Sequence, residues 1–310
     1  MKRVLVTGAS GFVGTHLVSY LHKKGFQIWA SEHRRLGNFA FPVHWVRTDL
    51  TSREEVLHLL QVSHPHYIFH LAGQSIPSES WKNFGLIMRL NVMASIFLLE
   101  GMVRCRSKAR ILLASSAQVY GTTFAGTQHV REDETANPTS PYAGSKLLME
   151  MAALNFARTH GIDLVIARSL NCVGSGQTAG TVFADFSKQV VSIERGRKPA
   201  VVQVGHLNVV RDFLHVDDAV RAYALLAQRA RRGGIYNVAS GQGVTLQKAV
   251  NFLAQKSRAR FQIKRVQSRF RKNDVPYAVA DTTKLRRLGW SPKKTVWDGL
   301  EEVLEDCRTQ

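Results

Sequence analysis

Two residues suited to acid–base chemistry stand four positions apart in SPYAGSKLLME, residues 140–150. On a helix, Tyr142 and Lys146 would share one face. A phenol is a weak acid, with an ordinary pKa of about 10, and a nearby ammonium lowers that pKa by stabilising the phenolate. We therefore expect Tyr142 to exchange a proton with a substrate oxygen beside Lys146. The alternative is an ordinary surface tyrosine and lysine.

A hydroxyl follows an apolar run in ILLASSAQVYG, residues 111–121. The run predicts a buried strand, and ligands of open α/β sheets bind outside the carboxyl ends of the strands. Ser116 would lie there, where it would hydrogen-bond a substrate carbonyl oxygen and orient it toward Tyr142. The expected catalytic residues are therefore Ser116, Tyr142 and Lys146.

Three glycines stand between an apolar run and a helical pattern in TGASGFVG, residues 7–14. Their spacing is G-x-x-G-x-x-G, which differs from the usual dinucleotide fingerprint. Gly8, Gly11 and Gly14 would permit a tight turn that brings backbone close to a pyrophosphate at the helix N-terminus. The alternative is a glycine-rich turn without a ligand.

The stretch ASEHRR, residues 30–35, bears on the choice of dinucleotide. We expect Ser31 to face the ribose, with Arg34 and Arg35 just beyond, and arginines suit the 2′-phosphate of NADP. Glu32 argues for the ribose 2′-hydroxyl of NAD instead. Asp49 is expected at the adenine edge, and its alternative role is a helix N-cap. The cofactor prediction is NADP, with NAD as the alternative.

Strand and helix patterns alternate through the first half of the chain, which is typical of a parallel sheet covered by helices. We expect an α/β Rossmann-type, doubly wound parallel sheet with a smaller mixed substrate-binding lobe. Residues 1–170 would form the dinucleotide-binding domain, with 213–240 rejoining it. Residues 171–212 and 241–310 would form the lobe. The expected strands are 3–8, 26–31, 44–50, 67–73, 110–116, 163–169 and 235–240, and the expected helices are 15–24, 53–61, one within 84–104, 142–159 and 216–228.

The composition suggests a protein of a reducing compartment. Three cysteines among 310 residues show no disulfide or metal-ligand spacing, so we expect no metal. We see no run near the roughly 18 apolar residues that a membrane span needs and expect a cytoplasmic protein without a membrane partner. The net charge of +19 favours anionic ligands. A basic stretch at 256–272 suggests an RNA-binding face as one interpretation. No aromatic-rich motif accompanies the charge, so a solvated basic surface is the preferred interpretation, and we expect no nucleic-acid partner.

The motifs TGASGFVG, HLAGQS, SSAQVYG and PYAGSK together resemble the extended short-chain dehydrogenase/reductases that act on nucleotide sugars. Strings in the second half, such as VGHLNVVRDFLHVDDAVRAY and LGWSPK, are similar to the GDP-4-keto-6-deoxy-D-mannose reductases that form GDP-D-rhamnose. The resemblance implies that Lys146 also holds the nicotinamide ribose. It implies cofactor contacts at Gly8, Gly11, Phe12, Val13, Gly14, Arg34, Asp49, Leu50, Leu71, Ala72, Gly73, Gln74, Ser75, Tyr142 and Lys146. It implies nucleotide-sugar contacts at Asn171, Lys188, Arg211, Arg271 and Asp274. For Arg211 the alternative is a structural pair with Asp212 or Asp217.

The residues after Ser116 narrow the chemistry that this resemblance implies. Related dehydratases carry an acidic residue two positions after the catalytic hydroxyl, whereas this chain has Gln118, and an amide is not a base. Related epimerase-reductases carry a cysteine next to the serine, whereas this chain has Ala117. Cys172 and Ser175, in NCVGSGQ, depart from the NHIGPGQ of the D-rhamnose-forming enzymes, and we expect both to alter the sugar end of the pocket.

We therefore expect an NAD(P)H-dependent reductase of the 4-keto group of a GDP-4-keto-6-deoxyhexose, giving GDP-D-rhamnose or a close stereoisomer. A nucleotide-sugar 4-epimerase with tightly bound NAD is the alternative. A 4,6-dehydratase and a non-catalytic dinucleotide- or RNA-binding scaffold are less favoured. The apolar helices near 84–104 and 142–159 suggest a homodimer through a four-helix contact, or else burial within one subunit.

Overall fold

Alternate side chains of the first strand, β1 (Arg3–Thr7), lie in two different hydrophobic cores. Val4 and Val6 pack in one core with Leu17 of the first helix, whereas Leu5 packs in the other with Leu98. Successive residues of a strand point to opposite faces of the sheet, so both faces of this one are buried. That arrangement is typical of a parallel sheet between two layers of helices.

The computed structural model describes residues 1–310 except 34–36, 76–79, 127–128, 178–179 and 271–274. Its main sheet has seven strands in the order β10-β6-β5-β4-β1-β2-β3, and all neighbouring strands are parallel. Besides β1, these strands are β2 (Gln27–Glu32), β3 (His44–Arg47), β4 (Tyr67–His70), β5 (Arg110–Ser116), β6 (Asp163–Ser169) and β10 (Ile235–Val238). The strand order reverses between β1 and β4, which is where ligands of such sheets bind.

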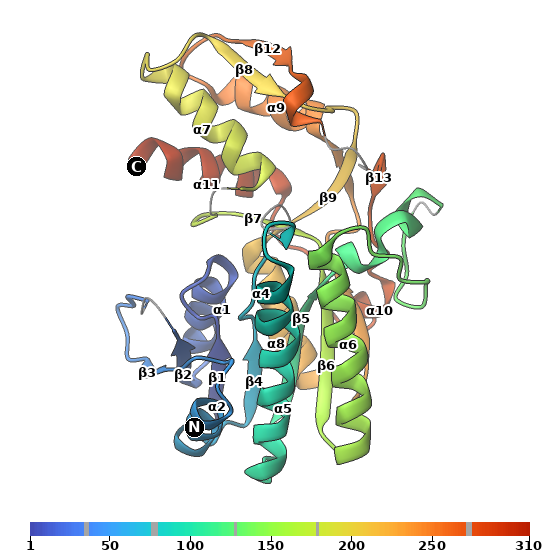
Figure 1. Ribbon diagram of the computed structural model, residues 1–310. Coiled ribbons are helices and arrows are strands. Elements are labelled where there is room, and N and C mark those ends of the chain that lie inside the picture. The colour runs from blue at the N-terminus through green and yellow to red at the C-terminus, as the bar shows by residue number, and fades with distance from the viewer. Residues whose placement is uncertain (34–36, 76–79, 127–128, 178–179, 271–274) are drawn as a thin grey trace.

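Helices cover both faces of this sheet (Figure 1). The helices α1 (Phe12–Lys23) and α8 (Val216–Arg229) contact each other on one face. On the other face lie α2 (Arg53–Ser63), α5 (Ala94–Arg104) and α6 (Pro141–His160). A short α4 (Phe84–Met88) and a π-helical turn η1 (Arg89–Met93) run directly into α5, and the 3₁₀ segment η2 (Ala117–Ala125) follows β5.

A smaller lobe lies beyond the carboxyl ends of the main strands (Figure 1). Its core joins side chains of α7 (Val182–Glu194), α9 (Leu246–Lys256) and α11 (Val296–Thr309), including Phe183, Leu253 and Leu300. Strands β8 (Val201–Val204) and β12 (Gln262–Arg265) form a two-stranded sheet. A mixed sheet contains β7 (Asn171–Val173), β9 (Val210–His215), β11 (Gly243–Thr245) and β13 (Tyr277–Ala278). The remaining short helices are η3 (Gln267–Arg269) and α10 (Thr283–Arg286). The fold-class prediction is confirmed, while the division into domains stays a prediction.

The second half holds more regular structure than its sequence suggested. The stretches SGQTAGTVFADF (175–186) and VVQVGHLNVVRDF (201–213) read as loop-rich in the sequence, whereas the structure has the start of α7 in the first and β8 and most of β9 in the second. Most of the lobe's strands have two to four residues, which is too short for an alternating pattern to stand out. Helix α7 is preceded by a glycine-rich stretch that reads as a loop, and its first residue is the β-branched Val182.

The expectation that no stretch is long and apolar enough to span a membrane is wrong. The continuous helical stretch Phe84–Arg104 has 21 residues with a mean hydropathy of 1.7, so its length and composition suffice to cross a bilayer. The core helix of a soluble protein passes the same test. Leu98 and Leu99 are buried against the sheet, whereas Phe84, Leu86 and Met93 are exposed. The stretch therefore has one buried face and one apolar face on the surface.

Candidate active site

The glycine loop joins β1 to α1 and packs so closely against neighbouring backbone that side chains would clash there. Gly8 has φ +68°, and a Cβ there would lie 2.8 Å from the Ala72 nitrogen. A Cβ at Gly14 would lie 2.1 Å from the Gly8 oxygen. Gly11 is the N-cap of α1 and has no side chain to bond the first backbone N–H groups. The first backbone N–H groups of α1, which include those of Phe12 and Val13, therefore have no capping side chain. This arrangement fits a dinucleotide pyrophosphate.

The end of β2 differs from the expectation for Ser31. Its side chain is 1% exposed and its hydroxyl has no hydrogen-bond partner among the described residues, so the prediction that Ser31 faces a ribose is wrong. Glu32 is the next residue and therefore points to the opposite side. Its carboxylate accepts a hydrogen bond from Ser10 of the glycine loop. The acidic side chain, rather than the serine, thus borders the loop, while Arg34 lies outside the described residues.

Asp49 is held by its own turn. Its carboxylate accepts hydrogen bonds from the Thr51 backbone and hydroxyl, each at 2.8 Å, and the backbone bond lowers the pKa of Asp49. The N-cap of α2 is Ser52, so Asp49 does not take the capping role considered above. Asp49 and Leu50 are both half-buried. Their contact with an adenine edge stays a prediction.

The segment Leu71–Ser75 follows β4 and passes close to Gly8. The backbone N–H groups of Leu71 and Ala72 donate to the Thr7 carbonyl and hydroxyl, each at 3.2 Å. Gly73 has φ +150°, and a Cβ there would lie 2.5 Å from Asn91 Oδ1 and 3.8 Å from Lys146 Nζ. Gln74 donates its backbone N–H to Asn91 Oδ1 at 2.9 Å. Gly73 and Ser75 are exposed, so this segment presents open backbone toward Lys146.

Asn91 is a site residue that the sequence analysis missed. It lies in the π-helical turn η1, is 1% exposed, and donates to the Ser145 hydroxyl at 2.9 Å. The backbone carbonyl of Asn91 accepts a hydrogen bond from the Ser95 hydroxyl, which also bonds His70 at 3.0 Å. Burial lowers the pKa of His70 to about 3, and the charge of Lys146 acts in the same direction. Polar residues four apart in an otherwise apolar helix were the signal that could have found Asn91 and Ser95.

Ser116 and Tyr142 come together as expected. Ser116 ends β5, and Tyr142 lies in the first turn of α6, where Ser140 is the N-cap. Both side chains are 7% exposed. Burial raises the pKa of Tyr142, and a hydrogen bond with Ser116 opposes that rise. The phenol therefore holds its proton at neutral pH, which suits a donor to a substrate oxygen.

Lys146 lies one turn further along α6 and is 6% exposed. Its Nζ donates to the Ala114 carbonyl at 2.8 Å. Burial lowers the pKa of Lys146 to about 8, and the charge of Glu150 opposes this. We expected Lys146 to lower the pKa of Tyr142, and this is wrong here: the groups that act on Tyr142 are Ser116 and Cys172, and the net shift is upward.

The two serines of the β5 tip have different partners. Ser115 donates to Glu150, which forms a buried ion pair with Arg168 at 2.7 Å. The two charged side chains are 2% and 6% exposed. The Arg168 guanidinium also lies 4.8 Å from the centre of the Tyr120 ring. This network ties β5, α6 and β6 together next to Ser116 and Lys146.

The positions after Ser116 hold no carboxylate. Ala117 is buried, and the exposed Gln118 donates its backbone N–H to Ser116 Oγ at 3.2 Å. Within the described residues, no carboxylate is among the groups that shift the pKa of Tyr142. Glu150 is neutralised by Arg168. The arrangement can donate a proton to an oxygen, and positions 117 and 118 offer no base for a neighbouring carbon.

The expected nucleotide-sugar residues are more scattered. Asn171, in β7, is exposed and donates to the Asp212 carbonyl at 2.9 Å. Lys188 is exposed on α7. Burial raises the pKa of Cys307 in α11, and the charge of Lys188 opposes that rise. Arg211 donates to the Val210 carbonyl at 2.7 Å. Arg271 and Asp274 lie outside the described residues.

The proposed structural partners of Arg211 are engaged elsewhere. Asp212 is buried and accepts from the hydroxyl of Ser240 at 2.6 Å and from two backbone N–H groups. Asp217 bonds His16 at 2.9 Å and Lys294 at 2.8 Å. The contacts of these two carboxylates therefore give no support to a structural pair with Arg211, whose role in binding a nucleotide sugar stays a prediction.

Only one of the two departures in NCVGSGQ lies near the catalytic tyrosine. Cys172 acts on the pKa of Tyr142, and burial raises the pKa of Cys172 itself to about 12. The Ser175 hydroxyl instead donates to Asp306 of α11 at 3.0 Å. The expectation that Ser175 shapes the sugar end of the pocket is therefore wrong. Its side chain is turned toward the C-terminal helix.

Comparisons with known proteins agree with this geometry. Residues 5–303 match the model of the family described as GDP-mannose 4,6 dehydratase. The GDP-6-deoxy-D-mannose reductase of Pseudomonas aeruginosa is 30% identical over 310 residues, covering 100% of this chain and 98% of the relative. The UDP-glucose 4-epimerase of Azospirillum brasilense is 29% identical, covering 96% of this chain and 89% of the relative. The solved structure of RMD from Pseudomonas aeruginosa complexed with NADPH has a TM-score of 0.87 at 28% identity, covering 100% of this chain and 99% of that one.

The sheet, the glycine loop and the serine–tyrosine–lysine site define an extended short-chain dehydrogenase/reductase. Within that class, the chain belongs to the family of the GDP-mannose 4,6 dehydratase model, whose members act on nucleotide sugars. The resemblance read from the sequence is thereby confirmed at the level of the family. Because a reductase and an epimerase both match at about 30% identity, the reaction itself has to be argued from the site.

Proposed function

We propose that this protein is an NAD(P)H-dependent reductase of the 4-keto group of a GDP-4-keto-6-deoxyhexose, and that its product is GDP-D-rhamnose or a close stereoisomer. One observation carries the proposal: the Ser116 hydroxyl and the protonated Tyr142 phenol meet without a carboxylate at positions 117 and 118. The 30% identity to a GDP-6-deoxy-D-mannose reductase along the whole chain supports the choice of substrate.

The residues divide the work of reduction between them. The dinucleotide, when bound, supplies the hydride. Ser116 donates a hydrogen bond to the ketone oxygen and orients it, and Tyr142 gives that oxygen its proton. Lys146 binds the nicotinamide ribose, with Asn91 and Gly73 shaping the backbone beside it. NADP, with NAD as the alternative, is supported by the NADPH complex of the structural relative.

The test is turnover of a defined substrate. GDP-4-keto-6-deoxymannose is mixed with the protein and NADPH or NADH, absorbance at the nicotinamide band is followed, and the product is identified by NMR. Stoichiometric cofactor oxidation with formation of a GDP-6-deoxyhexose is the expected result. Absence of oxidation with either cofactor would contradict the proposal.

A 4-epimerase is the second candidate because a UDP-glucose 4-epimerase is nearly as similar in sequence. Such an enzyme oxidises and re-reduces the same carbon, so it consumes no cofactor overall. Tightly bound NAD in the purified protein, together with interconversion of a UDP-hexose and no net NAD(P)H use, would favour it over the reductase.

We further propose a cytoplasmic homodimer. The exposed apolar residues of α4 and α6, including Phe84, Leu148 and Met151, support a four-helix contact, and three free cysteines suit a reducing compartment. A Met151→Glu variant would place a charge in that contact. Light scattering after size-exclusion chromatography should then give the mass of one chain, against two for the parent protein.

A further inference from the structure

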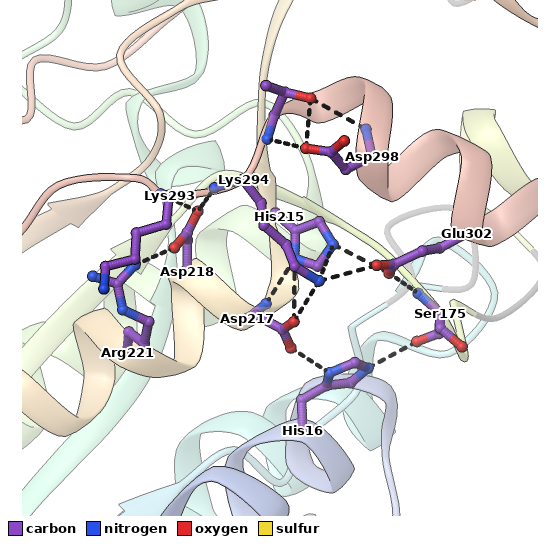
Figure 2. Close-up of polar contacts among 11 residues, drawn as sticks. His16, Ser175, His215, Asp217, Asp218, Arg221, Lys293, Lys294, Asp298 and Glu302 are labelled. Carbon is purple, nitrogen blue, oxygen red and sulfur yellow. Dashed lines mark hydrogen bonds and ion pairs between the residues drawn. The ribbon is translucent and has the colours of Figure 1, made fainter.

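A polar cluster joins the first helix to the loop that follows β7 (Figure 2). His16 comes from α1, and Ser175 lies in the loop. Asp217 comes from the first turn of α8, and Glu302 from α11. Lys294 precedes α11 and bonds both carboxylates, Asp217 at 2.8 Å and Glu302 at 3.1 Å. No catalytic role proposed above uses this cluster.

Both ring nitrogens of His16 face hydrogen-bond acceptors. Nδ1 lies 2.9 Å from the Asp217 carboxylate, and Nε2 lies 2.9 Å from the Ser175 carbonyl oxygen. Neither partner carries a proton to donate when Asp217 is ionised. A neutral imidazole has one N–H and would leave one of these contacts unmade. The geometry therefore assigns His16 as an imidazolium.

A second histidine in the same cluster provides an internal contrast. His215 Nδ1 accepts from the Asp217 backbone N–H at 3.1 Å, while Nε2 lies 3.1 Å from Glu302. One nitrogen accepts and the other donates, which a neutral ring satisfies. The two rings share carboxylates but differ in their partners, and only the partners of His16 demand two protons.

The charges around His16 act in the same direction. Burial lowers its pKa, but the hydrogen bonds to Asp217 and the Ser175 carbonyl and the charges of Asp217 and Glu302 outweigh burial, so the pKa of His16 is raised. Nearby positive charges oppose this rise in the pKa. Lys294 shares Asp217 with His16, and Lys23 and Arg221 line a surface groove beside His16. The groove opens His16 to solvent, so its proton equilibrates with the medium.

The loop that His16 holds connects two parts of the proposed active site. At one end, Cys172 adds to the rise that burial causes in the pKa of Tyr142. At the other, a Cβ at Gly176 would lie 3.9 Å from the ring of Phe12, the first residue of α1 after the glycine loop. The loop is also fixed to α11, because the Ser175 N–H donates to Glu302 at 3.1 Å and the Gly176 N–H to Asp306 at 2.6 Å.

We propose that His16 is a positioning residue: its imidazolium clasps residues 174–177 against the phosphate-binding end of α1, and loss of its proton releases them. A group with a raised folded-state pKa contributes its stabilisation below that pKa and loses it as the pH rises through it. The clasp is therefore closed below the raised pKa of His16 and opens as the pH rises through it.

The test reads the loop and the ring directly. NMR titration of the free protein gives the pKa of His16, and hydrogen exchange gives the protection of the Ser175 and Gly176 amides. We expect His16 to titrate above its ordinary 6.5. In His16→Asn, which keeps one donor of the two, these amides should exchange about tenfold faster below that pKa, as expected for a lost charge-assisted bond.

Matched variants separate the clasp from general destabilisation. His22→Asn makes the same change at an exposed position of the same helix and should leave exchange at 175 and 176 unchanged. Asp217→Asn should lower the pKa of His16 and move the release of the loop to lower pH. Titration of His16 at or below 6.5, or unchanged exchange in His16→Asn, would overturn the proposal. Its meaning for catalysis rests on the proposed reductase function, but neither measurement uses turnover, so the two can fail separately.

Discussion

The proposed catalytic residues and the residues proposed to bind the nucleotide sugar are held in different ways. Ser116, Tyr142 and Lys146 are at most 7% exposed and stand on a seven-residue strand and a twenty-residue helix. Asn171 and Lys188 are exposed, and Asn171 belongs to a strand of three residues. Buried side chains have few positions open to them, whereas exposed side chains such as those of Asn171 and Lys188 have more. The proposed catalytic side chains are thus held rigidly, whereas those proposed to bind the nucleotide sugar are held more loosely.

The largest effect should come from the rigid side. Tyr142→Phe removes the proposed proton donor while keeping the ring that fills the site. We expect turnover to fall by roughly 10²–10⁴-fold, the usual contribution of general acid catalysis, with cofactor binding retained. Steady-state kinetics and dinucleotide titration measure the two separately.

Tyr67→Phe serves as the control, because Tyr67 lies at the start of β4, at the opposite end of the sheet from the site. It should keep full activity. If Tyr142→Phe were as active as the parent protein, another group would have to supply the proton, and the comparison would lose its catalytic half.

The rigidity itself depends on the ion pair of Glu150 and Arg168. Arg168→Met would leave a buried carboxylate without its partner, which typically costs about 3–5 kcal/mol in the free energy of unfolding. Urea unfolding followed by circular dichroism measures this. Lys256→Met breaks an ion pair whose members are 42% and 46% exposed, and it should change the unfolding midpoint very little. Equal effects of the two variants would remove the distinction between a rigid and a loosely held side.

The same contrast explains how far the sequence could be read. The glycine loop and the Tyr142–Lys146 pair follow from spacing, because β1, α1 and α6 are long enough to set the direction of their side chains. Asn91 escaped notice because its partners, Gln74 and Ser145, are 17 and 54 positions away in the chain, although its spacing from Ser95 was a usable signal. Ser31 was misplaced because neighbouring residues of a strand point to opposite faces. Ser175 was misplaced because it lies in a turn after β7, where no periodic pattern sets the direction of a side chain. The ionisation of His16 depends on Ser175 and Asp217, which are 159 and 201 positions away in the chain, and local spacing cannot supply that.

The substrate side should respond more weakly and in a different kinetic constant. Arg211→Met removes a cation proposed to bind the nucleotide diphosphate. We expect KM for the GDP-sugar to rise roughly tenfold to a hundredfold, the range for a lost hydrogen bond to a charged group, with kcat changed much less. Arg197→Met, an exposed site after α7, is the matched control. A fall in kcat without a change in KM would place Arg211 with the catalytic residues instead.

The smallest expected effect concerns cofactor choice at the end of β2. Glu32 borders the glycine loop through Ser10, and its negative charge would repel a ribose 2′-phosphate more than a 2′-hydroxyl. Glu32→Gln keeps the shape and removes the charge, so the ratio of NADPH to NADH affinity should rise by roughly tenfold. Glu54→Gln, an exposed change on α2, should leave the ratio as it is. Fluorescence titration at fixed ionic strength measures the two affinities. If the NADPH to NADH affinity ratio of Glu32→Gln equals that of the parent protein, the carboxylate faces away from the ribose. The contacts that discriminate between the cofactors would then lie elsewhere.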